Sequence, residues 1–147
     1  MKILQINSHY NQGGAARIVA CIHRQLLEDG GTGEEEKNVI RIDKNYEVYL
    51  SALLCRITGL NGWWNQKAAR RLTALMDEIQ PDIVHIHTLH GYYMNFQILW
   101  NYLNKHDIPC VWTFHDCHAF TGNCGYYFAC RRWENGCGSC PDKKRYP

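Results

Sequence analysis

The hydrophobic pattern of this chain changes period repeatedly, and this alternation constrains its fold more than any other feature. Short apolar runs of strand length alternate with longer segments in which apolar residues recur every three or four positions. The expected strands are residues 3–6, 39–42, 83–87 and 110–114, and the expected helices are residues 15–29, 46–57, 66–79 and 95–106. Apolar strands that alternate with amphipathic helices are typical of a parallel sheet covered by helices on both faces. We therefore predict a Rossmann-like α/β fold with at least four strands.

The alternation stops near residue 114. The chain has 147 residues, which is the size of one domain. Residues 115–147 are rich in cysteine, glycine and aromatic residues and show neither a helical nor a strand period. Such a length without regular structure is unusual in a compact domain, so something other than apolar burial must hold it. We predict an α/β core over residues 1–114 and a Cys-rich segment over residues 115–147 within the same domain.

Charge and hydropathy exclude several classes of protein. The net charge of +2 is too small to indicate, by charge alone, a protein that binds nucleic acid or a membrane. No apolar run reaches the roughly 18 residues of a membrane span, and the apolar start at residues 3–6 is too short for a signal peptide. These features predict a cytoplasmic protein. In that compartment cysteines bind metal or fill the core more often than they form disulfides.

Four cysteines of the last segment give the strongest local signal. They follow the spacing C-x5-C-x6-C-x2-C, at Cys124, Cys130, Cys137 and Cys140. Glycines beside the last pair permit a tight turn that directs both sulfur atoms towards one ion. Four thiolates suit a structural zinc ion, which would also explain how a segment without a pattern folds. Two disulfides, an iron–sulfur cluster and free thiols remain alternatives.

A diglycine, Gly13 and Gly14, lies between the first expected strand and its helix. Unpaired backbone N–H groups at a helix N-terminus attract phosphate or a sugar hydroxyl, and glycine allows a ligand to approach the main chain. The three-glycine fingerprint of dinucleotide-binding proteins is absent, which disfavours a dehydrogenase. A tight turn without a ligand is the alternative.

Histidines follow two of the other expected strands. His85 and His87 share one face of their strand, and a pair with this spacing can bind a metal. We expect His85 to pack inside, and His87 and His90 to lie in a cleft at the carboxyl ends of the strands, where open α/β sheets bind ligands. His115 lies at the same predicted edge and could bind a substrate hydroxyl or act as a general base.

Several of these motifs together resemble a known family. They are the opening strand, Gly13-Gly14-Ala15-Ala16-Arg17, Pro81-Asp82-Ile83-Val84-His85-Ile86-His87 and Trp112-Thr113-Phe114-His115-Asp116. The combination resembles the N-terminal half of family 4 glycosyltransferases. The Cys-rich run from residue 115 to 147 is similar to a subgroup that is usually linked to bacterial capsule, exopolysaccharide or lipopolysaccharide assembly.

The resemblance implies a fold of two Rossmann-like halves, known as GT-B, and an activity. Such enzymes transfer a sugar from a nucleotide-sugar donor to an acceptor hydroxyl, usually with retention and without a required metal. The N-terminal half mainly holds the acceptor, here a glycan or a lipid-linked glycan. By matching motifs, Gly13 and Gly14 would lie near the donor phosphates or the acceptor, and Arg17 would belong to the same substrate-binding set. His115 would orient the donor sugar, and Asp116 would assist it.

The family pattern also needs a second half, which carries the nucleotide pocket. We therefore expect a fragment that cannot transfer sugar alone, located in the cytoplasm or at the inner face of the membrane, with possible membrane contact as a property to test. Two other functions stay open. One is a zinc-stabilised binding module without enzymatic activity. The other is a metal-dependent hydrolase that uses His85, His87 and His115.

Overall fold

The computed structural model describes residues 1–10, 12–30, 39–122 and 124–137. The chain divides into two compact units, Met1–Thr113 and Phe114–Pro147.

The first unit is built on a parallel sheet. Its strands are β1 (Ile3–Ile6), β2 (Ile83–Ile86) and β3 (Cys110–Trp112), in the spatial order β1-β2-β3. Leu4 lies opposite Val84, and Val84 lies opposite Cys110. The central strand is therefore β2, which is separated from β1 by most of the helices of the unit.

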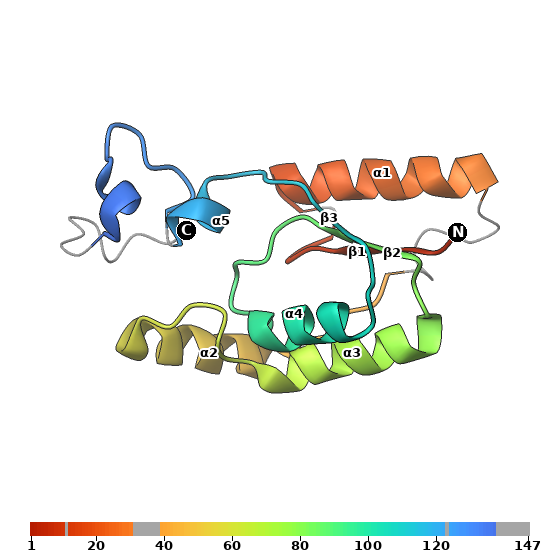
Figure 1. Ribbon diagram of the computed structural model, residues 1–147, viewed down its shortest axis with the longest axis horizontal. Helices are drawn as coiled ribbons and strands as arrows, with labels where there is room; N and C mark the ends of the chain where they lie inside the picture. Colours follow the sequence, from red (N-terminus) through yellow and green to blue (C-terminus); the bar gives the residue numbers. More distant parts are fainter. Residues whose placement is uncertain (11, 31–38, 123, 138–147) are drawn as a thin grey trace. The chain divides into compact units, whose positions relative to one another are not determined.

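Helices cover both faces of this sheet, as the sequence predicts (Figure 1). They are α1 (Gly14–Gly30), α2 (Asn45–Thr58), α3 (Gln66–Ile79) and α4 (Phe96–Lys105). Helix α1 lies on one face of the sheet, and α3 and α4 lie on the other (Figure 1). The Rossmann-like α/β architecture is thus confirmed.

The core lies between the sheet and the pair α3 and α4. Val84 and Ile86 of β2 are fully buried there, together with Met76 of α3 and Leu99 of α4. Each of these apolar side chains is worth about 1.5–3 kcal/mol when it leaves water. This packing fixes β2, and with it the loop that follows β2.

The strand predicted at residues 39–42 is wrong, and so is the expectation of at least four strands: the described residues form three. Val39 and Ile40 are exposed rather than packed in a sheet. The backbone oxygen of Ile42 accepts a hydrogen bond from Nε of Arg71, at 2.6 Å, instead of one from a neighbouring strand. The apolar run therefore forms an extended connection into α2.

The described residues of the second unit form two short helical turns, α5 (His118–Thr121) and a 3-10 helix, η2 (Arg132–Asn135). Three aromatic rings pack together here. The ring centroids of Phe120 and Trp133 are 5.1 Å apart, and those of Tyr127 and Trp133 are 5.3 Å apart. Aromatic contacts therefore supply part of the packing in a segment whose sequence shows no period.

Candidate functional site: the carboxyl edge of the sheet

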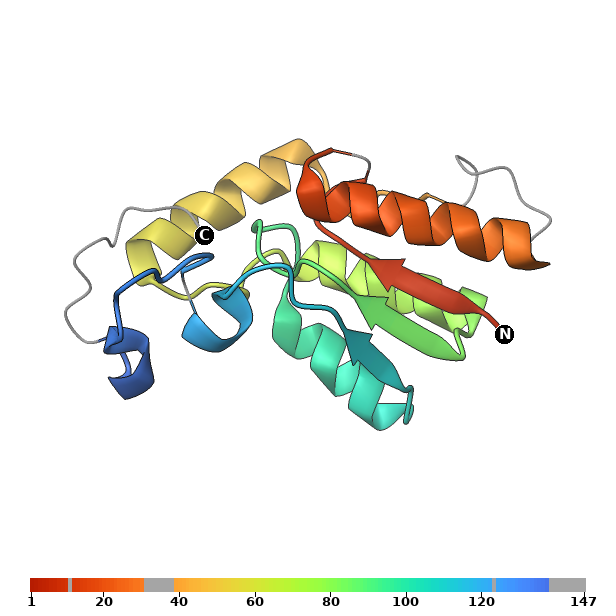
Figure 2. The ribbon, with the colours of Figure 1, turned by 90° about the horizontal axis from the view of Figure 1, so that it is seen from above.

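Two loops that carry candidate residues meet at the same edge of the sheet. All three strands run in parallel, so their carboxyl ends lie at one edge, as the arrowheads in Figure 2 show. The diglycine turn follows β1, and His87 directly follows β2. The structure thus brings the first two sequence-predicted features together at the edge where α/β sheets bind ligands.

The diglycine turn leaves its backbone open. Gly13 adopts φ 85°, a left-handed conformation that favours glycine, and its oxygen accepts a hydrogen bond from the Arg17 N–H at 3.1 Å. Gly13, Gly14 and Arg17 are all exposed. A Cβ atom built on Gly14 would meet no atom within 4 Å. The start of α1 can therefore approach a phosphate or a hydroxyl group through its main chain.

His87 is buried at the end of β2 and is held through its backbone. Its N–H donates to the oxygen of Ile6 at 2.9 Å, and its own oxygen accepts from Nε1 of Trp112 at 3.0 Å. Its ring packs against that of His85, with centroids 4.0 Å apart. Nε2 of His85 lies 2.9 Å from Oγ1 of Thr113. His85 and His87 thus form part of the framework beneath the edge, whereas His90 is half-buried in the loop above it.

Three polar residues that the sequence analysis did not identify join the loops after β1 and β2. Oδ1 of Asn7 accepts a hydrogen bond from the Thr88 N–H at 3.0 Å. The hydroxyl of Tyr93 donates to the oxygen of Thr88 at 2.8 Å, and burial raises its pKa well above the usual range, which keeps it a donor. Asn7 and Thr88 each stand just after a strand, and that position is the signal that could have identified them.

The predicted catalytic residues belong to the second unit. His115 is half-buried. Oδ1 of Asp116 accepts a hydrogen bond from the His118 N–H at 2.9 Å, at the start of α5. Asp116 therefore has a local structural role in addition to the catalytic one that we predict for it.

Three of the four candidate zinc ligands are half-buried in the second unit: Cys124, Cys130 and Cys137. Cys140 lies outside the described residues. No two described cysteines are joined in a disulfide, and the described part of the chain holds no group of three or more His, Cys, Asp or Glu side chains that could share a metal ion. The described thiols thus do not by themselves make a zinc site, and the four-cysteine site stays a prediction.

Comparison with known proteins decides the family. The family described as Glycosyltransferase Family 4 matches residues 12–136, which include the diglycine turn, both histidine loops and most of the Cys-rich segment. The chain belongs to glycosyltransferase family 4. This membership confirms the family inferred from the sequence motifs and favours a transferase over a metal hydrolase or a non-enzymatic binding module.

One relative gives this family 4 chain a more specific context. The chain is 27% identical to the putative colanic acid biosynthesis glycosyl transferase WcaC of Escherichia coli (strain K12), in an alignment that covers 100% of this chain and 41% of the relative. The chain thus spans about two-fifths of the length of that relative. No solved structure matches it significantly. Among the described residues, no helix combines the length and the apolar character needed to cross a bilayer.

Proposed function

We propose that this chain is the acceptor-side part of a glycosyltransferase of polysaccharide biosynthesis. In this proposal the enzyme transfers a sugar from a nucleotide-sugar donor to a hydroxyl of a glycan or lipid-linked acceptor, with retention at the anomeric carbon. The observation that carries the proposal is the open diglycine turn at the carboxyl edge of the sheet, inside the region that matches the family. The name of the colanic acid relative supports the polysaccharide setting.

The chemistry of sugar transfer suits the groups at this edge. Positive charge develops on the sugar and negative charge on the departing phosphate, so fixed dipoles that face the phosphate lower the barrier. In our proposal the backbone N–H groups of Gly13 and Gly14 lie where the acceptor meets the donor phosphate, so they contact both, and Arg17, one turn further along α1, supplies a cation on the same side. His115 orients the donor sugar, and Asp116 assists it. Transfer itself requires no metal, and zinc would serve only the fold of the second unit.

In our proposal the two halves of the whole enzyme bind different substrates. By resemblance, the nucleotide pocket belongs to a second Rossmann-like half, and this chain holds the acceptor. We therefore propose that residues 1–147 bind acceptor without turning over donor. We place the chain in the cytoplasm, at the inner face of the membrane, where a lipid-linked acceptor would lie.

Incubation of the chain with nucleotide sugars and an oligosaccharide acceptor tests this division. We expect acceptor binding by isothermal titration calorimetry and no released nucleotide. Turnover of any nucleotide sugar by the isolated chain would overturn the acceptor-side assignment. Absence of binding to every bacterial exopolysaccharide fragment offered would count against the acceptor site.

A further inference from the structure

Two asparagines cap the N-termini of α3 and α4. Oδ1 of Asn65 accepts a hydrogen bond from the Ala68 N–H of α3 at 3.4 Å, and Oδ1 of Asn95 accepts one from the Ile98 N–H of α4 at 3.0 Å. Asparagine is common at this position because its side-chain oxygen satisfies a backbone N–H group of the first turn. Capping uses only the oxygen of each side-chain amide, so the nitrogen can bind another partner.

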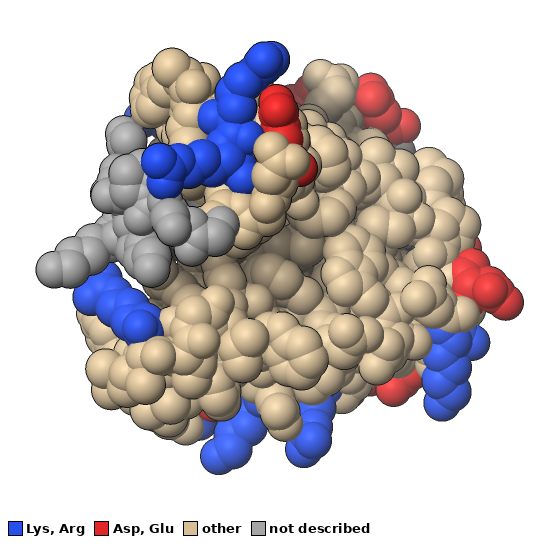
Figure 3. Space-filling model, turned by 60° about the vertical axis from the view of Figure 1, so that its left-hand side comes forward, with Lys and Arg blue, Asp and Glu red and all other residues tan. Residues whose placement is uncertain are grey.

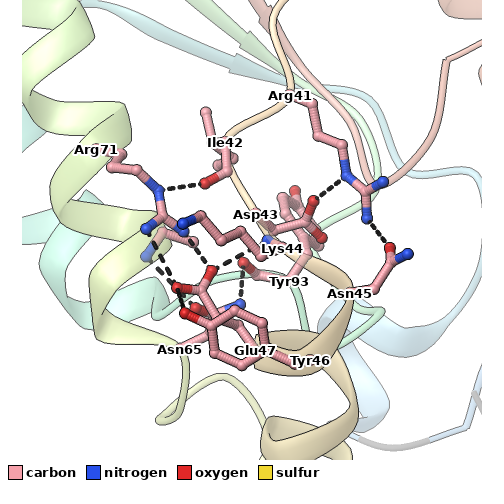
Figure 4. Close-up of polar contacts among 11 residues, drawn as sticks. Arg41, Ile42, Asp43, Lys44, Asn45, Tyr46, Glu47, Asn65, Arg71 and Tyr93 are labelled. Carbon is pink, nitrogen blue, oxygen red and sulfur yellow. Dashed lines mark hydrogen bonds and ion pairs between the residues drawn. The ribbon is translucent and has the colours of Figure 1, made fainter.

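Each amide nitrogen donates to the segment that precedes the other helix. Nδ2 of Asn65 donates to the oxygen of Tyr93 at 2.8 Å (Figure 4), and Nδ2 of Asn95 donates to the oxygen of Trp63. Trp63 and Tyr93 each lie two residues before the asparagine that caps their own helix, so the two bonds are reciprocal. We name this pair of bonds the asparagine clasp.

The two loops that the clasp joins are in close contact. The N–H of Phe96 donates to the oxygen of Gly62 at 2.8 Å, and a Cβ atom built on Gly62 would collide with the Phe96 ring. Gly62 also adopts φ 75°, a conformation that favours glycine. A glycine at this position therefore allows residues 59–65 to lie against the start of α4.

Further hydrogen bonds connect the clasp to the candidate site. Tyr93 is buried, and its hydroxyl donates to the oxygen of Thr88 at 2.8 Å. The N–H of Thr88 in turn donates to Oδ1 of Asn7, at the carboxyl edge of the sheet. The loop that follows β2 is thus fixed at one end by the loop after β1 and at the other end by the clasp.

The clasped loops consist of uncharged residues. Residues 59–65 have the sequence GLNGWWN and residues 88–95 the sequence TLHGYYMN, without Lys, Arg, Asp or Glu. Helices α3 and α4 both begin at the left of Figure 1. In Figure 3, which brings this side forward, Lys and Arg side chains stand apart with uncharged surface between them. Aromatic side chains with a few polar groups are typical of small-molecule sites. This composition favours an uncharged sugar over a phosphate or a uronic acid.

The ring of Trp63 is accessible although its backbone is fixed. The residue is 56% exposed, whereas its backbone oxygen is held by Asn95. A large ring on a fixed backbone loses little conformational freedom when it contacts a ligand. It can pack against the apolar C–H face of a sugar ring, while polar groups nearby bind the hydroxyls.

We propose that the clasped loops form a subsite for an uncharged sugar unit of the acceptor. The Trp63 ring packs against the sugar, and Asn65 and Asn95 are positioning residues that hold the two loops in place. The inference rests on the proposed function for the identity of the ligand as an acceptor. The contact with an uncharged sugar is argued from the loops alone.

NMR titration of the 147-residue chain with cellobiose, lactose and mannobiose tests the preference for an uncharged sugar. We expect at least one of these neutral disaccharides to bind. Digalacturonate, which carries two carboxylates, should bind at least about tenfold more weakly than the best of them. Binding of no neutral disaccharide, or tighter binding of digalacturonate, would overturn the proposal.

Substitution of Trp63 tests the contact itself. Trp63→Ala should weaken disaccharide binding about tenfold, because the sugar loses its aromatic partner, whereas Trp63→Phe should retain most of the affinity. The matched control is Tyr49→Ala, which removes an exposed ring from α2 and should bind like the wild type. Equal affinity of Trp63→Ala and the wild type would reject the contact.

Asn65→Asp separates the clasp from the cap. Aspartate keeps the oxygen that caps α3 and tolerates the left-handed backbone at this position, φ 55°, but it has no amide nitrogen to donate. The loop should then occupy its binding conformation less often. We expect about fivefold weaker disaccharide binding and about fivefold faster hydrogen exchange at the Thr88 amide.

Glu47→Gln is the control for a general loss of stability, because it breaks the ion pair with Arg71 and leaves the clasp intact. Its disaccharide affinity should equal that of the wild type. Faster exchange in Asn65→Asp without weaker binding would reject the positioning role, and so would unchanged exchange.

These experiments distinguish failure of the subsite from failure of the proposed function. Exopolysaccharide fragments that bind the wild type, Trp63→Ala and Asn65→Asp equally would keep the acceptor role and reject the subsite. Turnover of a nucleotide sugar by the chain would reject the acceptor-side assignment, whereas the disaccharide titrations would still decide the sugar contact.

Discussion

At the scale of single residues, a substitution of Gly14 can distinguish an effect on stability from an effect on ligand binding. It is the first residue of α1 and has free space where a side chain would lie. Gly14→Ala should leave the free energy of unfolding unchanged or raise it by up to about 1 kcal/mol, because alanine suits a helix better than glycine. The added methyl group should nevertheless weaken ligand binding by about tenfold or more, since it occupies the path to the backbone.

Urea denaturation and isothermal titration calorimetry measure these two effects on the same samples. Ala15→Ser, at the next position of α1, serves as a control that leaves the diglycine turn intact. If Gly14→Ala bound donor and acceptor like the wild type, no ligand would contact this turn.

At the scale of secondary-structure elements, an ion pair between Glu47 and Arg71 connects α2 to α3. The hydrogen bond from Arg71 is the main reason that the pKa of Glu47 lies below its ordinary value of 4.5. A carboxylate with a lowered pKa stabilises the fold above its unfolded-state pKa and loses this contribution as the pH falls through its folded-state pKa. We expect Glu47→Gln to lower the free energy of unfolding by about 1–3 kcal/mol at neutral pH, and the difference to shrink below about pH 4.

Urea denaturation across pH checks this expectation. Glu78→Gln, an exposed position on α3, should change stability by no more than about 0.5 kcal/mol. If the free energy of unfolding of Glu47→Gln stayed below the wild-type value by the same amount down to acid pH, the charge of the carboxylate would not be what holds α2 in place.

The same elements show how far the sequence determines the fold. Hydrophobic periodicity located β1, β2, β3 and the four long helices, because burial against the sheet imposes each period. It failed at residues 39–42, where the partner of the Ile42 oxygen is Arg71, a residue distant in the sequence. Helix α2 was predicted from its period, but its ion pair with α3, between Glu47 and Arg71, is a contact that periodicity does not reveal.

The candidate site, like the fold, was predicted from the sequence only in part. Glycine between a strand and a helix, and histidine after a strand, are local signals, and the structure places both at one edge of the sheet. The hydrogen bond between Asn7 and Thr88 joins two loops that are distant in the sequence, so this pairing follows only from the folded arrangement.

At the scale of the whole molecule, the second unit needs a source of stability beyond its aromatic cluster. We predict that Cys124, Cys130, Cys137 and Cys140 bind zinc. Cys137→Ser should lose the metal and the near-UV circular dichroism of the second unit, because metal binding and folding are coupled in small sites. Cys21→Ser, an exposed position on α1, should retain both.

Elemental analysis of purified protein measures the metal directly. Zinc that is lost with Cys137 and kept when His85 and His87 are replaced would support the cysteine site. A metal-free sample in which the second unit, Phe114–Pro147, is folded would contradict a structural role for zinc.

Amide chemical-shift mapping on the isotopically labelled chain, titrated with an exopolysaccharide oligosaccharide, would show directly where an acceptor binds. We predict that the shifts change at Gly13, Gly14 and the loop from Thr88 to His90, at the carboxyl edge of the sheet. Changes confined to the opposite edge, around Lys2, Asp82 and Pro109, would contradict an acceptor site at the diglycine turn.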